Sequence, residues 1–280
     1  MSDPQNMSDP PKITDPKSAG ITAKNVTVTY RNGTTALRDA SFEIPTGTIT
    51  ALVGVNGAGK STLFKALMGF VPAAKGQISI LGKPVKTALK LNIVAYVPQA
   101  EEVDWSFPVL VEDVVMMGRY GHMGFLRTPR AKDHAAVTHA LERVNMTAFR
   151  DRQIGELSGG QRKRVFLARA LAQDSDLYLM DEPFAGVDAA TESAIVELLK
   201  DLRSKGKTVI VVHHDLQSAR EYFDMLLLLN MRVVAFGPTA EVFTTELLQK
   251  TYGGRLTILS EMAEKAAREG IGKIHPKNEP

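Results

Sequence analysis

The sequence predicts an α/β fold, and three features of the chain carry that prediction. Short apolar runs typical of buried strands, at Ile49–Val53, 177–180 and Thr208–Val212, alternate with segments of helical periodicity. The segment that joins the last two runs is apolar along one helical face from residue 195 to residue 202. A glycine-rich loop follows the first run and precedes a helix. Strand, loop and helix in this order are what a phosphate-binding loop requires.

Composition limits the kind of protein this is. The 280 residues, 44% of them hydrophobic and 23% charged, predict one large domain. The absence of cysteine excludes disulfides and thiolate metal sites. The longest apolar runs, such as 225–229, are far shorter than the roughly 18 residues that span a bilayer, so we expect a cytoplasmic protein. The net charge of +3 favours contact with an anionic membrane surface only weakly, and hardly favours nucleic acid.

The organisation along the chain follows from local composition. Residues 1–20 are rich in Pro, Asp, Ser and Lys and have no apolar period, so we expect a disordered tail. The folded domain is expected over 21–260, with a helical subdomain at about 100–157, and a helical and polar tail over 261–280. Within the domain we expect an antiparallel hairpin with strands at 21–30 and 42–44, a strand at 92–97, and a final strand pair at 225–229 and 233–236.

The glycine-rich loop fits the phosphate-loop pattern, in which glycines let consecutive backbone amides point at one anion. The helix that follows adds the positive end of its dipole. Lys60 is expected to reach the β- and γ-phosphates of ATP, and the Ser61 hydroxyl to bind its Mg²⁺. The nucleotide-binding residues expected here are Gly54, Asn56, Gly57, Gly59, Lys60, Ser61 and Thr62.

Two acids end the apolar run at 177–180. This arrangement delivers one carboxylate to Mg²⁺ and a second toward the attacking water. We therefore expect Asp181 to bind Mg²⁺ and Glu182 to act as the general base. An acidic pair after a strand is on its own usually a solvated loop start, and the phosphate loop elsewhere in the chain favours the catalytic interpretation.

Between these motifs lies Leu157-Ser158-Gly159-Gly160-Gln161, followed by a helix with an apolar face. Ser158 can cap that helix, and the free amides beside the two glycines can accept a second phosphate group. The segment resembles the signature of the ABC ATPase superfamily. The resemblance covers roughly residues 22–259 and implies an ABC-type P-loop ATPase core with an antiparallel β subdomain and a helical subdomain. It also implies a head-to-tail homodimer, in which Ser158, Gly159, Gly160 and Gln161 of one copy face the ATP of the other.

The same resemblance assigns four further residues. Gln99 matches the glutamine that contacts Mg²⁺ and water, and His214 matches the histidine that contacts the γ-phosphate. Asp188 matches the loop that crosses the dimer interface. Tyr30 resembles the aromatic that stacks on adenine, although a strand tyrosine can also simply pack on the hairpin. His213 receives no role.

Residues 103–108 and 116–122 are similar to segments in the ATPases of manganese, iron and zinc importers, with the manganese and chelated-iron group as the nearest match. The resemblance implies a coupling helix from a membrane permease after Gln99, with Trp105 and Phe107 as exposed anchors. These aromatics could instead fill the subdomain core. The metal would be supplied by a periplasmic or extracellular binding protein, and this chain would not bind it. The subunit would lie peripherally on the cytoplasmic face of the membrane.

Other functions remain open at this stage. A zinc importer fits the same segments. A non-transport ABC ATPase that acts on nucleic acid would usually carry long coiled coils or zinc modules, and this chain has neither heptads nor cysteine. A regulatory module that binds ATP without hydrolysing it is disfavoured by the intact Glu182 and His214.

Overall fold

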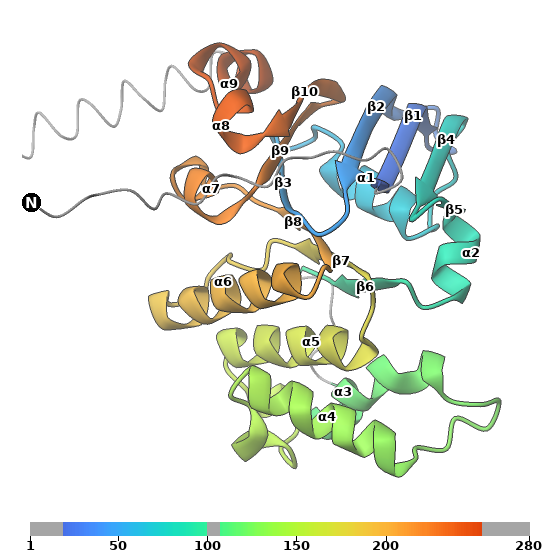
Figure 1. Cartoon of the computed structure of the whole chain (residues 1–280), viewed down its shortest axis with the longest axis vertical. Helices are drawn as coiled ribbons and strands as arrows, with labels where there is room; N and C mark the ends of the chain where they lie inside the picture. The colour runs from blue at the N-terminus through green and yellow to red at the C-terminus, as the bar shows by residue number, and fades with distance from the viewer. Residues whose placement is uncertain (1–18, 100–106, 254–280) are drawn as a thin grey trace, which may run out of the picture.

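The structure of the protein is a computed structural model that describes residues 19–99 and 107–253 (Figure 1). Its centre is a six-stranded sheet with the order β10-β9-β3-β8-β7-β6. The strands pair in parallel except β10, which runs antiparallel to β9 at one edge. The α/β prediction is confirmed. The strands are β3 (Ile49–Val53), β6 (Val94–Val97), β7 (Leu177–Asp181), β8 (Thr208–Val212), β9 (Met225–Asn230) and β10 (Arg232–Pro238).

The central sheet is covered on both faces, which is why its strands are continuous apolar runs. Every residue of β3, β7 and β8 is buried. Side chains of β3 alternate between two apolar clusters, with Ala51 and Val53 in one and Leu52 in the other. The first cluster includes side chains of α5 and α6, and the second includes those of α1. These helices are α1 (Lys60–Leu67), α5 (Gly159–Gln173) and α6 (Ala189–Ser204).

A second, four-stranded sheet has the order β2-β1-β4-β5. The expected hairpin is confirmed, since β1 and β2 pair antiparallel. Two expectations are corrected here. Ala19 and Gly20 belong to β1 and not to the tail, because Ala19 pairs with Pro45 and the Gly20 carbonyl accepts a bond of 2.9 Å from the Leu81 amide. The third strand, β4, was not expected. The strands are β1 (Ala19–Thr29), β2 (Thr35–Pro45), β4 (Lys75–Ile80) and β5 (Lys83–Pro84).

The helical subdomain lies below the central sheet in Figure 1. Its helices α3 and α4 both pack on α5, the helix expected after Ser158. Apolar side chains of the three helices join one core cluster with the sheet. The elements are α3 (Val111–Met116), the 3-10 helix η3 (Met117–His122), α4 (Ala131–Arg143), and the 3-10 helices η4 (Thr147–Phe149) and η5 (Ile154–Glu156).

Short helices complete the fold. The last two, α8 and α9, pack against β9 and β10. Within residues 19–99 and 107–253, no helix is long and apolar enough to cross a bilayer. The predictions for residues 1–18, for Trp105 and for 261–280 lie outside the described residues. The helices are α2 (Val85–Lys90), α7 (Leu216–Tyr222), α8 (Thr239–Val242) and α9 (Thr245–Tyr252).

Candidate nucleotide site

The phosphate loop lies between β3 and α1, as its sequence predicts, and its glycines are held by close neighbours. A side chain at Gly54 would place its Cβ 2.1 Å from the Leu229 carbonyl oxygen. Gly59 has φ +97°, and its Cβ would lie 2.6 Å from the carbonyl oxygen of Ala36. At these two positions the loop backbone lies so close to neighbouring strands that a residue with a side chain would not fit. Asn56 and Gly57, at the crest of the loop, are exposed.

Lys60 begins α1 and is buried, with only 7% of its surface exposed. Its Nζ donates to the Gly54 carbonyl at 2.8 Å and to the Val55 carbonyl at 3.1 Å. Burial lowers the pKa of Lys60, and the carboxylates of Glu182 and Asp181 partly offset this. The two acids thus lie close enough to act on the ammonium, which brings the loop and the end of β7 together at one place.

The residues next to Lys60 face in two directions. Ser61 is exposed and Thr62 is buried. The Thr62 Oγ1 lies 3.0 Å from the hydroxyl of Tyr30, just beyond β1, so Tyr30 is tied to the first turn of α1. Contact of Tyr30 with adenine stays a prediction, since this hydrogen bond places its ring beside the loop and does not show what covers its face.

Three further predicted residues meet after the ends of neighbouring strands. Gln99 follows β6, Glu182 follows β7 and His214 follows β8, and these strands are adjacent in the sheet. His214 Nε2 lies 2.5 Å from Glu182 Oε1, and Gln99 Nε2 donates to Glu182 Oε2 at 3.4 Å. Carboxyl ends of parallel strands are where α/β sheets gather functional groups. Both carboxylate oxygens of Glu182 are thus positioned by side chains from other strands.

Glu182 itself has a backbone of the kind found at functional turns. Its φ is +50°, a left-handed conformation that is uncommon for a residue with a side chain. Asp181, the last residue of β7, is buried. A cavity of about 140 Å³ adjoins Glu182 and is lined also by Phe184, His214 and Asp215. The turn therefore keeps Asp181 in the sheet and directs Glu182 toward this space.

His213 has a different environment from its neighbour. It is buried, with ring centroids of Phe184 and Phe223 at 5.3 and 5.1 Å, and its Nε2 lies 2.8 Å from the Ser218 hydroxyl. Burial lowers the pKa of His213, because the apolar surroundings disfavour the charged ring. This is a core position, consistent with the sequence giving His213 no role.

The signature segment forms the first turn of α5. Ser158 Oγ accepts a bond from the Gln161 amide at 3.3 Å, and Gln161 Oε1 accepts one from the Ser158 amide at 2.9 Å. A Cβ at Gly159 would meet no atom within 4 Å, and one at Gly160 would meet only the Thr191 hydroxyl at 3.9 Å. The surface at Gly159 and Gly160 is therefore open, which leaves room for a large anion from outside the chain beside the N-terminus of α5.

Asp188 caps α6 directly beside the signature. Its carboxylate accepts a bond of 2.7 Å from the Thr191 amide, which is the main cause of the lowered pKa of Asp188. Both the signature helix and α6 lie on the opposite side of the central sheet from α1 (Figure 1). The predicted binding residues hence form two groups, with Ser158 and Asp188 in one and Lys60 in the other.

Sequence reasoning missed Lys163, which joins the signature helix α5 to the loop after β7. From the second turn of α5 its Nζ donates to the Ala185 carbonyl, and to the Glu182 carbonyl at 3.4 Å. It fixes the loop that carries the general-base candidate to the helix that carries the signature. No sequence pattern identifies this contact, because it depends on how α5 packs beside β7.

We expect Lys163→Met to lower ATP turnover about tenfold or more with ATP affinity nearly unchanged. Small displacements of a reacting group are costly, and the loop would lose the cation that holds two of its carbonyls. Lys163→Arg keeps a donor and should retain more activity than Met. Phosphate-release kinetics, with binding of a fluorescent ATP analogue as the comparison, measure both. Equal turnover in the Met variant and the parent would contradict this positioning role.

The chain is similar to a known family and to several known proteins. Residues 37–185 match the family described as "ABC transporter". The chain is 58% identical to the "Chelated iron transport system membrane protein YfeB" of Yersinia pestis, over 84% of this chain and 80% of that protein. It is 56% identical to the "Manganese transport system ATP-binding protein MntB" of Bacillus subtilis, over 85% and 94% of the two chains. The "Zinc transport system ATP-binding protein TroB" of Treponema pallidum is 54% identical, over 85% and 88%.

A solved structure agrees with the sequence matches. A metal-chelate type ABC transporter in an inward-facing conformation has a TM-score of 0.73 to this chain, with 30% identity. The similarity covers 83% of this chain and 88% of that one.

Proposed function

Because the chain belongs to the ABC transporter family, we propose that its ATP hydrolysis powers the import of a divalent transition metal, with manganese or iron as the cargo. One observation carries the proposal: Gln99, Glu182 and His214 meet after the ends of three adjacent strands. The carboxylates of Asp181 and Glu182 also act on the ammonium group of Lys60. The names of two similar proteins, YfeB and MntB, supply the class of cargo.

The residues around Lys60 suit a magnesium–nucleotide complex. Ser61 is exposed, Asp181 ends β7, and Gln99 carries an amide oxygen beside the nitrogen that donates to Glu182. Hydroxyl, carboxylate and amide oxygens are the hard ligands that Mg²⁺ prefers. When bound, the ion would neutralise charge on the phosphates. Asn56, Gly57 and Gly59 supply backbone amides to the same phosphates.

Hydrolysis follows from what surrounds Glu182. Its carboxylate accepts the proton of the attacking water, while Gln99 and His214 hold its two oxygens in place. His214 then contacts the γ-phosphate from the end of β8. Lys60 stabilises the negative charge that the transferred group carries.

Two copies of the chain complete the site. The signature turn lies on the far side of the sheet from α1 and has open space at Gly159 and Gly160, so Ser158 and these two glycines serve an ATP held by another copy. Asp188 lies beside them at the same surface. The head-to-tail homodimer therefore has two composite sites, each built from one phosphate loop and one signature turn.

Transport requires a permease in the membrane, and the chain reaches it through the segment after Gln99. Phe107 is 64% exposed and Leu110 is 38% exposed at the start of the helical subdomain. Exposed aromatics are common anchors at protein interfaces. A separate metal-binding protein outside the cytoplasm delivers the cargo to the permease, and this subunit stays peripheral on the cytoplasmic face. Since TroB is named a zinc transport protein, zinc is the second candidate cargo.

We expect Phe107→Ala to slow metal uptake about thirtyfold while the basal ATPase and melting temperature stay unchanged. Loss of an interface anchor often costs on the order of 2 kcal/mol, and the exposed ring supports little of the fold. Phe70→Ala removes a ring that is 68% exposed after α1 and serves as the matched control. A parallel fall in uptake, ATPase and stability would show that Phe107 supports the subdomain and not the permease contact.

Cargo identity is tested in cells that lack the endogenous subunit. Growth under separate manganese, iron and zinc limitation, with the wild-type chain or Lys60→Ala, reports which metal depends on its ATP site. Rescue by the wild-type chain under manganese or iron limitation is the expected result. Rescue under zinc limitation alone would favour the second cargo, and rescue by Lys60→Ala would contradict ATP-driven transport.

A further inference from the structure

The turn between η3 and α4 exposes two large apolar side chains that take no part in the nucleotide site. The Arg127 amide donates to the Gly124 carbonyl at 2.9 Å, so Phe125 and Leu126 occupy the two corner positions of a closed turn. Phe125 is 102% exposed and Leu126 is 85% exposed. These are the most exposed large apolar side chains among the described residues.

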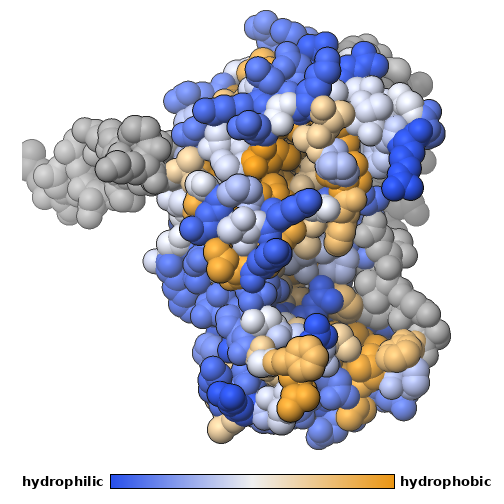
Figure 2. Space-filling view, turned by 90° about the vertical axis from the view of Figure 1, so that its right-hand side faces the viewer, coloured by the Kyte–Doolittle hydropathy of each residue, from blue (hydrophilic) through white to orange (hydrophobic). Residues whose placement is uncertain are grey.

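Such residues are unusual at a turn corner. Gly, Pro, Asn and Asp dominate these positions because they suit the backbone and the solvent. Phe125 and Leu126 bury nothing here, and even a Cβ at the neighbouring Gly124 would meet no atom within 4 Å. Figure 2 shows apolar surface on the helical part of the molecule, at the bottom of the view, as well as on the part above it. The turn therefore protrudes, and the benefit of its apolar pair must come from something outside the chain.

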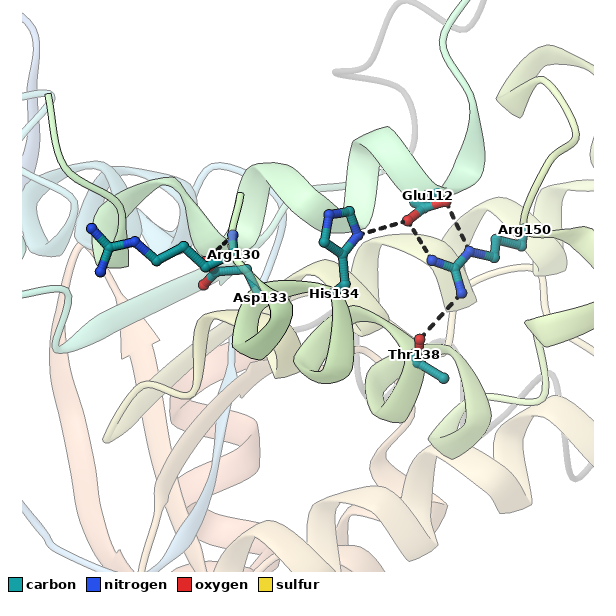
Figure 3. Close-up of polar contacts among 6 residues, drawn as sticks. All are labelled: Glu112, Arg130, Asp133, His134, Thr138 and Arg150. Atoms are coloured by element: carbon teal, nitrogen blue, oxygen red, sulfur yellow. Dashed lines mark hydrogen bonds and ion pairs between the residues drawn. The ribbon is translucent and has the colours of Figure 1, made fainter. Parts of the chain in front are cut away.

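Three exposed cations lie close to the turn in sequence, and two of the three acids that border this stretch are paired. The sequence from Val114 to Lys132 contains no Asp or Glu. Arg127, Arg130 and Lys132 are exposed, and the Arg127 guanidinium lies 5.3 Å from the centre of the Tyr120 ring. Figure 3 shows the Arg130 guanidinium extending away from Asp133.

Asp113, which directly precedes this stretch, is exposed. The other two acids that border it, Glu112 and Asp133, have partners inside the fold. Asp133 is 1% exposed and accepts a bond from Arg119 at 3.1 Å, while its other oxygen accepts the Arg130 amide at 3.0 Å. Glu112 pairs with Arg150 and lies 3.4 Å from His134 Nδ1 (Figure 3). Arg119 and Arg150 thus neutralise these acids, and the surface around the turn keeps a positive excess.

We propose that the Gly124–Arg127 turn inserts shallowly into an anionic phospholipid surface, with Arg127, Arg130 and Lys132 on the headgroups. An apolar pair that protrudes beside cations matches the two signals that hold peripheral proteins at a bilayer, burial of apolar groups and attraction to anionic lipid. A chain that binds a protein partner more often does so with a groove, whereas this turn is convex. The contact goes beyond the proposed transport function, because the helical subdomain would touch the lipid as well as the permease.

The test is flotation of the full chain with phosphatidylcholine vesicles, with and without 40% phosphatidylglycerol, at low ionic strength. One variant is Phe125→Ser with Leu126→Ser, and a second replaces Arg127, Arg130 and Lys132 by Gln. Each should lower the fraction bound to anionic vesicles at least about fivefold. Matched controls are Phe70→Ser, and Lys75, Lys83 and Lys86 each replaced by Gln, which change exposed residues of the same kinds elsewhere. The controls should bind like the parent.

A second measurement reports insertion directly. The chain has no cysteine, so Leu126→Cys gives a single site for an environment-sensitive fluorophore. Its emission should shift to the blue with anionic vesicles and not with neutral ones, while the same label at Ser193 on α6 should not respond. Parent-like flotation of both turn variants, or no shift at residue 126, would overturn the proposal. Unchanged vesicle binding with weaker copurification of the permease would likewise overturn it and assign the turn to a protein contact. Neither measurement depends on ATP hydrolysis, so its failure leaves the proposed function untouched.

Discussion

Glu182→Gln is expected to lower ATP turnover by about a hundredfold or more while ATP binding is retained. An amide cannot take the proton of the attacking water, and general-base catalysis contributes roughly 10²–10⁴ in rate. The amide has nearly the shape of the carboxylate, so Gln99 and His214 keep a partner and the loop should keep its fold. Phosphate release measures turnover, and a fluorescent ATP analogue measures binding. Dimers should accumulate with ATP, which size-exclusion chromatography detects.

The matched control is Glu197→Gln on α6, where the side chain is 73% exposed and pairs with Lys200 at 3.2 Å. Its turnover should equal that of the parent. Near-normal hydrolysis by a verified Glu182→Gln protein would remove Glu182 from the role of base.

Ser158→Arg is expected to abolish hydrolysis while the nucleotide affinity of the monomer stays nearly unchanged. The long side chain would replace the cap of α5 and fill the accessible space over its first amides, where the ATP of the other copy is expected. Lys60 and its loop lie on the other side of the sheet and would not be disturbed. Titration of the monomer with nucleotide and phosphate release by the dimer measure the two effects.

A mixed dimer makes this prediction sharper. One subunit carries Ser158→Arg and the other carries Lys60→Ala, so one composite site has both changes and the other has neither. If the sites act independently, the mixed dimer should recover about half of the parent turnover, although each variant alone is inactive. An inactive mixed dimer would contradict independent sites in trans and point to action within one chain or to strong coupling.

Much of the fold could be predicted because local patterns agree with the tertiary structure. The glycine-rich loop after an apolar run and the acids at the end of another apolar run are typical of a phosphate-binding α/β fold. The structure has both apolar runs as buried strands of the central sheet, as expected. Strand β4 was missed because its sequence, Lys-Gly-Gln-Ile-Ser-Ile, has little apolar period and is mostly exposed at the N-terminal end. Its pairing with β1, and not its composition, makes it a strand.

The candidate site was predictable in its parts and not in its assembly. Gln99, Glu182 and His214 were each expected from their motifs, and the sheet order explains why they meet. The contact of Lys163 with the loop after β7 depends on helix packing, which carries no sequence signal. Likewise, the separation of Ser158 from Lys60 follows from the two faces of the sheet, and it supports the proposal that two copies complete each site.

The central claim is that ATP hydrolysis by this chain drives metal import. It is tested most directly with the chain and its permease in proteoliposomes, with ATP supplied on the side where the chain is bound and metal-loaded binding protein on the other. Uptake of radioactive manganese or iron should require both ATP and the binding protein, should rise in step with phosphate release, and should stop with Glu182→Gln. Uptake that persists with Glu182→Gln, or ATP turnover that never moves metal under any of these conditions, would contradict the account.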